Sequence, residues 1–167
     1  MQITLPAFGA IIPGQGGRLA AIMRGPVVGG AELPPYALLV SDQSTEIERV
    51  TWGKYGEEIA GAGSRVDGRA NTAGMLAAKC PAAVKACAVQ ADGHKDFYVP
   101  SLGELNAAAA NVPELFDAKG VYWTSTQGSR DGAFVQDFQY GFSDWYGKVF
   151  KFRVRAVRQI PLELLSA

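Results

Sequence analysis

The sequence has little of what catalysis and cross-linking usually require. Its 167 residues include one histidine, His94, and two cysteines, Cys80 and Cys87. A zinc site draws on several Cys or His ligands at short spacing, and a Ser or Cys nucleophile needs a base beside it, so neither chemistry has a recognisable set of residues here. Helical spacing would place the two cysteines about 10 Å apart, whereas a disulfide needs Cα atoms within about 7 Å. We therefore expect two reduced thiols that serve in packing, and neither a metal nor a cofactor.

The chain also lacks an excess of charge and any long apolar run. Sixteen Lys and Arg balance sixteen Asp and Glu, which removes the basic surface expected of a nucleic-acid binder or of a protein attached to an anionic membrane. No stretch approaches the roughly 20 apolar residues that cross a bilayer. No Lys or Arg precedes the first apolar run, which Pro6 and Pro13 interrupt. We therefore expect neither a signal peptide nor membrane insertion.

Glycine and proline, in contrast, are abundant for so apolar a chain. Twenty Gly and nine Pro accompany a hydrophobic content of 48%. A chain of this length buries roughly 70% of its unfolded surface and sustains a core without staples. The combination predicts one packed domain with many turns and long loops. Residues 1–35 are interpreted as a Gly/Pro-rich arm with one short strand, Arg18–Arg24, and residues 36–167 as the rest of the domain.

Caps and periodicity predict helices flanked by strands. Asp67 is expected to start a helix that ends near Lys79, and Pro81 suits the first turn of another that ends near Asp92. The Ser-x-x-Glu spacing at 101–104 is that of a capping box and predicts a helix to about residue 110. Strands are expected at 36–41, 121–124, 133–140 and 149–157, with a long irregular loop over 42–65. Strands, helices and more strands, without alternating βαβ units, predict an α+β domain with antiparallel sheets.

The strand expected at 149–157 alternates cleanly between apolar and basic residues. The apolar residues predict a face toward the core: Phe150, Phe152, Val154 and Ala156. The basic residues predict a solvated face: Lys151, Arg153 and Arg155. The wider basic run from Lys148 to Arg158 could meet an anionic glycan or a phosphate, but pairing with acids of neighbouring strands is the favoured interpretation.

The segment 141–147, Gly-Phe-Ser-Asp-Trp-Tyr-Gly, lies between two expected strands and has glycine at both ends. We interpret it as a loop that displays large aromatic side chains, the type enriched at binding hot spots. The alternative is that these aromatics pack under their own loop. The candidate ligand-binding residues are Tyr140, Phe142, Asp144, Trp145, Tyr146 and Lys148.

No catalytic residues are predicted. His94 lies in a turn-like Asp-Gly-His-Lys-Asp segment and is expected to be structural, although an enzyme that uses His94 with a cysteine or carboxylate is a weaker hypothesis. The hydroxyls of 124–126 could contact a substrate, but short hydroxylated residues at a strand end more often satisfy backbone groups. The pairs Glu57–Glu58 and Asp137–Asp144 specify neither an acid/base couple nor a calcium loop.

Five motifs in order resemble one family. They are Trp-Gly-Lys-Tyr-Gly at 52–56, Asp-Gly-x-Ala-Asn-Thr at 67–72, Asp-Gly-His-x-Asp-Phe-Tyr-Val-Pro-Ser-x-x-Glu-Leu at 92–105, Tyr-Trp-Thr-Ser-Thr at 122–126 and Arg-Val-Arg-Ala-Val-Arg at 153–158. The set resembles a family of bacterial and phage proteins typified by the C-terminal domain of a collagen-like adhesin (Lcl-type), over roughly residues 36–160. The resemblance implies a C-type-lectin-like fold, in which two to three helices pack on small antiparallel sheets with long loops and these motifs are structural.

The family also suggests a role. Members with a similar N-terminal half are typical of phage and prophage genomes. The resemblance thus implies a non-enzymatic virion protein, made in the host cytoplasm and associated with the tail, whose displayed residues recognise a host surface glycan or protein. Residues 1–35 would contact other virion or tail subunits, and the chain would form a homo-oligomer. The alternative is a structural or assembly protein of the virion without a ligand of its own.

The sequence departs from two relatives of this fold. Calcium-dependent lectins use Trp-Asn-Asp and Glu-Pro-Asn ligand sets, which are absent here. Formylglycine-generating enzymes use cysteines near the end of the domain, whereas Cys80 and Cys87 lie in the helical region. We therefore expect neither calcium-dependent sugar binding nor that oxidase activity.

Overall fold

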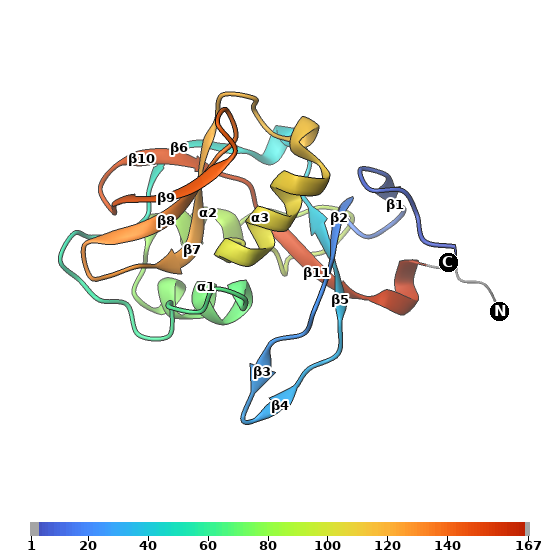
Figure 1. Cartoon of the computed structure of the whole chain (residues 1–167), viewed down its shortest axis with the longest axis horizontal. Coiled ribbons are helices and arrows are strands. Elements are labelled where there is room, and N and C mark those ends of the chain that lie inside the picture. Colours follow the sequence, from blue (N-terminus) through green and yellow to red (C-terminus); the bar gives the residue numbers. More distant parts are fainter. Residues whose placement is uncertain (1–3, 166–167) are drawn as a thin grey trace.

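Residues 4–165 are described by the structure, a computed structural model, and they form a mixed α+β architecture (Figure 1). Within this part, three α-helices pack against two larger sheets, and a two-stranded hairpin projects from the body. The α+β class predicted from the order of elements is confirmed. Short 3-10 helices lie at Gln43–Thr45, Pro113–Leu115 and Leu162–Leu165.

The first larger sheet brings the early and late parts of the chain together. Its antiparallel order is β1 (Ile11–Ile12), β2 (Gly17–Met23), β5 (Tyr36–Val40) and β11 (Val157–Pro161). β5 is buried along its whole length between β2 and β11, as its unbroken apolar sequence predicts. The strand expected at Arg18–Arg24 is β2, so this portion of residues 1–35 belongs to the body of the protein.

The second sheet contains five strands, in the order β6 (Ile47–Thr51), β10 (Lys151–Val154), β7 (Val121–Gln127), β8 (Gly132–Asp137) and β9 (Phe142–Gly147). β10 pairs with β7 in parallel, and the other pairs are antiparallel. The irregular loop expected over 42–65 is wrong in part, because β6 lies within it. The single strand expected at 149–157 is also wrong: β10 and β11 lie in different sheets, and residues 155–156 carry the chain between them.

The helices follow their sequence signals. α1 (Gly68–Ala77) begins after Asp67, whose carboxylate accepts from the backbone N–H of Ala70 at 3.0 Å. α3 (Leu102–Asn111) begins after Ser101, whose hydroxyl accepts from the N–H of Glu104 at 3.2 Å. α2 (Pro81–Cys87) starts at its proline but ends at Cys87, before the expected boundary near Asp92. Asp92 and Gly93, both with positive φ angles, belong to a separate turn.

The core has two main parts on opposite faces of β7. Trp123 packs with Met75 of α1 and Ala83 of α2. Tyr122 packs with Leu105 of α3 and Leu38 of β5. Successive residues of a strand point to opposite faces, so β7 separates the layer of α1 and α2 from α3 and the four-stranded sheet.

The hairpin that projects from the body is formed by β3 (Val27–Val28) and β4 (Ala31–Glu32), which pair only with each other (Figure 1). Gly29 and Gly30 connect them with φ angles of +59° and +81°, the conformation that a tight two-residue hairpin turn requires. From here on, the arm means residues 24–35 alone and not the whole of residues 1–35. The projecting part of the N-terminal segment is thus this internal hairpin.

Candidate binding surface

The segment 141–147, expected to be a loop, includes the edge strand β9, which pairs with β8 over its whole length. Asp137 closes the turn before it, because its carboxylate accepts from the backbone N–H of Tyr140 at 3.0 Å. Gly141 completes that turn with φ +74°. The loop prediction is wrong because only the first of the two flanking glycines lies in a turn, and the second lies in the strand ladder.

Aromatic side chains are exposed along the hairpin of β8 and β9 and in the turn that follows it. The exposed fraction is 71% for Tyr140, 54% for Trp145, 47% for Phe142 and 38% for Tyr146. Phe150, predicted to face the core, is 53% exposed, because β10 begins one residue later and Phe150 lies in the turn that precedes it. We call these five residues the aromatic surface. Its members do not all pack under their own loop, which favours the display interpretation.

Trp145 has the most defined position in the aromatic surface. A Cβ atom at Gly132 would lie only 2.1 Å from Cε3 and 2.3 Å from Cζ3 of the indole, so the ring rests on the backbone of β8 where only glycine leaves room. Beside it, Phe134 pairs with Trp145 across the strands, and the guanidinium of Arg65 lies 5.5 Å from the Phe134 ring centroid. The indole is therefore held in place while more than half of it is exposed.

Tyr146 lies on the opposite face of the hairpin, since neighbouring residues of a strand alternate. Its ring contacts Phe150 at 5.7 Å and Phe152 at 5.0 Å between centroids, both edge-on. Phe152 in turn contacts the buried ring of Trp123 at 5.0 Å. At the turn, Tyr140 stacks on Phe142 with centroids 6.3 Å apart. The predicted set is thus distributed over both faces of β9.

Asp144 places a carboxylate on β9, the strand at the edge of the five-stranded sheet. Its carboxylate accepts a hydrogen bond from the backbone N–H of Trp145 at 2.8 Å. Acidic side chains on an edge strand disfavour pairing with a strand of another chain. A partner of this hairpin is therefore expected to contact its side chains and not to extend its ladder.

Lys148 is predicted to be displayed for ligand binding, and this prediction is wrong, because Lys148 is fully buried. Its Nζ donates to the backbone carbonyl of Glu57 at 2.7 Å and to Oε1 of Gln127 at 3.0 Å. It also lies 4.7 Å from the ring centroid of Trp52, and burial lowers the pKa of its ammonium group. Lys148 therefore holds the loop after β6 against the sheet and is not displayed.

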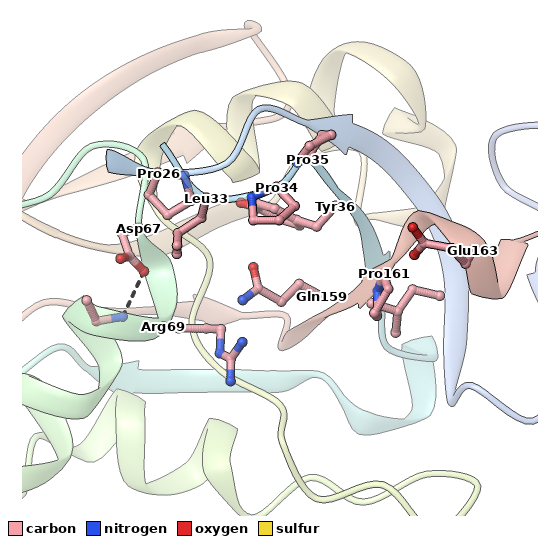
Figure 2. Close-up of a pocket in the computed structure, with 12 residues that line it drawn as sticks. Pro26, Leu33, Pro34, Pro35, Tyr36, Asp67, Arg69, Gln159, Pro161 and Glu163 are labelled. Atoms are coloured by element: carbon pink, nitrogen blue, oxygen red, sulfur yellow. Dashed lines mark hydrogen bonds between the residues drawn. The ribbon is translucent and has the colours of Figure 1, made fainter. Parts of the chain in front are cut away.

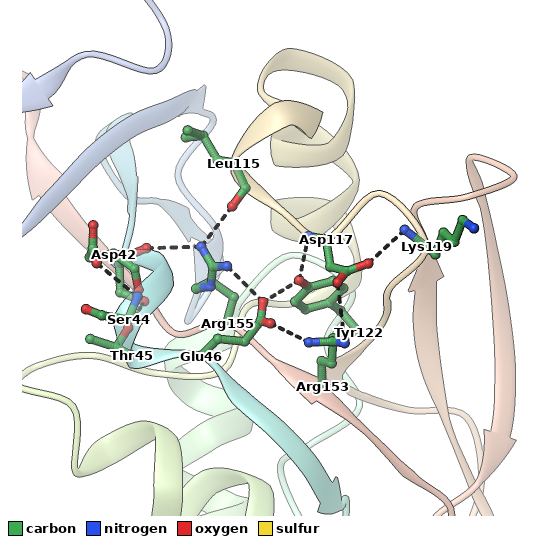
Figure 3. Close-up of polar contacts among 11 residues, drawn as sticks. Asp42, Ser44, Thr45, Glu46, Leu115, Asp117, Lys119, Tyr122, Arg153 and Arg155 are labelled. Carbon is green, nitrogen blue, oxygen red and sulfur yellow. Dashed lines mark hydrogen bonds and ion pairs between the residues drawn. The ribbon is translucent and has the colours of Figure 1, made fainter.

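The solvated basic face predicted for 151–155 is also wrong beyond Lys151 (Figure 3). Glu46 accepts from Arg155 at 2.8 Å and from Arg153 at 2.7 Å, and the hydroxyl of Tyr122 donates to the same carboxylate. The Arg155 side chain is 1% exposed. Arg155 is buried because it lies where the chain passes between the two sheets, and Arg158 is likewise buried beside Asp96.

The smaller polar candidates contact backbone groups, which favours the structural interpretation. His94 Nε2 lies 2.9 Å from the carbonyl oxygen of Gly14 and so joins two turns. Thr124 donates to the carbonyl of Phe134, and Thr126 to that of Ser64. These hydroxyls are buried and satisfy backbone groups.

The sequence does not reveal that the carboxyl group of Glu104 is buried. Glu104 is 1% exposed, and its Oε1 accepts from the Tyr36 hydroxyl at 3.0 Å and from the backbone N–H of Gly68 at 3.2 Å. Its Oε2 and the hydroxyl of Tyr98 are both buried and interact with each other, and neither has another partner in the described structure. Burial raises the pKa of Glu104 to about 7. The capping-box spacing identifies the residue but not these long-range contacts.

A groove of about 510 Å³ lies between the base of the arm, the start of α1 and β11 (Figure 2). Its wall on the arm side is apolar and includes Pro26, Leu33 and Pro34, and Ile160 lines it from β11. Asp67 and Arg69 line it from the side of α1. Nothing in the sequence pattern indicates this groove, because its walls come from three distant segments.

The thiols of Cys80 and Cys87 are free, and burial raises the pKa of both. Raised thiol pKa values disfavour the reactive thiolate. Within residues 4–165, no group of three or more His, Cys, Asp or Glu side chains is arranged to hold a metal ion. No helix in that range has the length and apolar character needed to cross a membrane. In comparisons with known proteins, no family model and no curated protein sequence matches this chain.

Proposed function

We propose that this is a non-enzymatic phage or prophage virion protein, associated with the tail, that recognises a host surface glycan or protein through the aromatic surface. We also propose that its α+β architecture is of the C-type-lectin-like kind. The support for the virion setting and for this fold is the resemblance of the five ordered motifs. The support for recognition is the geometry of the β8–β9 hairpin.

The buried tryptophans of the motifs serve the scaffold and are not displayed for recognition. Trp52 and Trp123 belong to two of the motifs and are fully buried. Their indole N–H groups donate to the backbone carbonyls of Thr124 at 2.8 Å and Val50 at 2.9 Å. Buried indoles with a satisfied N–H are structural residues.

The single observation that carries the proposal is the exposure of five aromatic rings on β9 and on the turns at its two ends, with the indole of Trp145 resting against Gly132. Large exposed apolar patches mark interaction sites. Rigid aromatic side chains also lose little conformational entropy on binding, which favours affinity.

Binding of the purified protein to host cells and to their surface polysaccharide tests the proposal. We expect a Tyr140→Ala/Trp145→Ala variant to bind roughly 30-fold more weakly, the change that corresponds to about 2 kcal/mol at a hot spot. Both side chains are exposed, so the fold should survive their removal. Phe8→Ala is the matched control, because Phe8 is an exposed aromatic residue outside the aromatic surface, and this variant should bind as the wild type does. Equal binding by the double variant and the wild type would remove the aromatic surface from the mechanism.

A second candidate function, assembly of the virion, is favoured by the arm. Val27 and Val28 are exposed on a hairpin that projects from the body (Figure 1). Such a hairpin suits docking on a neighbouring subunit. This function would stand alone if the aromatic double variant bound the host normally while arm variants failed to assemble.

A further inference from the structure

The carboxyl group of Glu104 lies between two elements that line the groove. Its Oε1 accepts from the hydroxyl of Tyr36, the first residue of β5, and from the backbone N–H of Gly68, the first residue of α1. Tyr36 itself lines the groove, and so do Asp67 and Arg69, the two neighbours of Gly68 (Figure 2). One side chain of α3 thus joins the strand that follows the arm to the start of α1.

The chain packs directly against this carboxyl group. A Cβ atom at Gly68 would lie 2.9 Å from Oε2 of Glu104, 2.8 Å from Cε2 of Tyr98 and 2.7 Å from the backbone nitrogen of Ser101. Glu104 is 1% exposed, and the buried hydroxyl of Tyr98 interacts with the same carboxyl group. An ionised carboxylate at this position could therefore be hydrated only if the packed elements moved apart.

In the described part of the chain, the elements around Glu104 offer it no ion pair. α3 and β5 contain no Lys or Arg, and α1 contains only the exposed Arg69, beside the acidic cap Asp67. The ionisable residues of the other segments next to α3 have partners elsewhere: Arg18 donates to Gly9, Tyr122 to Glu46 and Arg158 to Asp96, and Asp137 accepts from Tyr140. Hydrogen bonds without a cation leave burial dominant, and the pKa of Glu104 is raised to about 7.

We propose that Glu104 is a proton-sensitive latch, which joins β5 to the start of α1 while it carries its proton and lets this contact open at the groove when the proton is lost. The neutral carboxyl group favours the closed state because its burial costs less than that of a carboxylate. The opening is expected at the groove, since Tyr36 and the residues on both sides of Gly68 line it. This goes beyond host recognition and virion assembly and depends on neither.

Amide hydrogen exchange in the first turn of α1, measured by NMR on the full chain, tests the proposal. The N–H groups of Gly68, Ala70 and Asn71 are all bonded, the first to Glu104 and the others to Asp67. We expect their protection, corrected for the intrinsic effect of pH on exchange, to fall about tenfold from pH 6 to pH 8. This fall follows from a carboxyl pKa of 4.5 in the open state and of about 7 in the closed state. Dilute urea should leave this exchange unchanged, because a local opening exposes little surface.

Two variants separate the latch from a contact that is only structural. Glu104→Gln keeps a hydrogen-bonding side chain without a titrating proton, so protection in the first turn of α1 should not change with pH. Tyr36→Phe removes a donor that favours the carboxylate, so the fall in protection should continue to a pH about one unit higher before it levels off. His94→Gln is the matched control. It removes the single histidine of the chain, the type of side chain that ordinarily titrates near neutrality, and should respond to pH as the wild type does.

Several results would overturn the proposal. One is equal protection of the first turn of α1 at pH 6 and pH 8 in the wild type, and another is a pH response that Glu104→Gln retains or that His94→Gln abolishes. If Glu104→Gln does not fold, a fall in Tyr36→Phe that levels off at the wild-type pH has the same meaning. The last is exchange at Gly68 that dilute urea quickens as much as it does at the buried Val135 of β8, because α1 would then open only when the whole chain unfolds.

Discussion

Glu104 links three parts of the fold through one carboxyl oxygen, and its burial makes the stability of the protein depend on pH. The pKa is raised from 4.5 to about 7 by burial, so the folded state binds this proton more tightly than the unfolded state does. Stability from this group is therefore complete below about pH 4.5 and is lost as the pH rises to about 7. The total change is on the order of 3 kcal/mol.

A Glu104→Gln variant should remove this dependence. The amide oxygen can still accept from Tyr36 and Gly68, and the amide nitrogen can donate to the hydroxyl oxygen of Tyr98. We expect urea midpoints measured from pH 5 to pH 8 to fall for the wild type and to fall less for the variant, which should be the more stable protein at pH 8. Parallel pH profiles for the two proteins would contradict this assignment.

At the scale of an element, the loop after β6 depends on interactions that reach into it from the sheet. Lys148 donates to the Glu57 carbonyl, and Gln127 accepts from the Ile59 N–H at 3.0 Å. We expect Lys148→Met to keep the contact with Trp52 but to lower the free energy of unfolding by about 1–3 kcal/mol, because the Glu57 carbonyl and Gln127 lose a charged donor. Hydrogen exchange at Ile59 should quicken while exchange in α3 changes little.

The matched control for this prediction is Lys85→Met, on the exposed side of α2. It removes the same charge without removing a buried donor, so the loop should exchange as in the wild type. Equal exchange at Ile59 in Lys148→Met and Lys85→Met would show that the buried ammonium does not order the loop.

Elements with local signals could be predicted, and those defined by distant partners could not. Asp67, Ser101 and Pro81 mark the starts of the three helices because caps act within one turn. The alternation at 149–157 predicts a strand but not its division, since only the pairing of β10 with β6 and β7, and of β11 with β5, separates the two parts.

The candidate site shows the same limit. Aromatic content identifies the region around Trp145, and four of its predicted rings are exposed. Nothing in the sequence near Lys148 or Arg155 reveals their burial, because Glu57 and Glu46 lie 91 and 109 residues away from them. An isolated basic residue is usually solvated, and only tertiary contacts reverse that expectation here.

At the scale of the whole molecule, the two larger sheets meet at the ion-pair cluster of Figure 3. The chain crosses between the sheets at 41–46 and again at 155–156. Glu46 lies in the first crossing and Arg155 in the second, and their side chains join at 2.8 Å. The Arg155 guanidinium also donates to the carbonyl of Leu115 at 2.9 Å, so the connection after α3 is held at the same point.

This arrangement predicts that one carboxylate affects both sheets. Glu46→Ala leaves the buried guanidinium of Arg155 without its anion and should lower the free energy of unfolding by about 3–5 kcal/mol, the usual cost of breaking a buried pair. Glu32→Ala, which breaks the exposed pair with Arg24, should change it little. Urea unfolding followed by both far-ultraviolet circular dichroism and tryptophan fluorescence should give coincident transitions in each protein. If Glu46→Ala were no more harmful than Glu32→Ala, or if the two signals separated in the wild type, the sheets would be stable independently of this cluster.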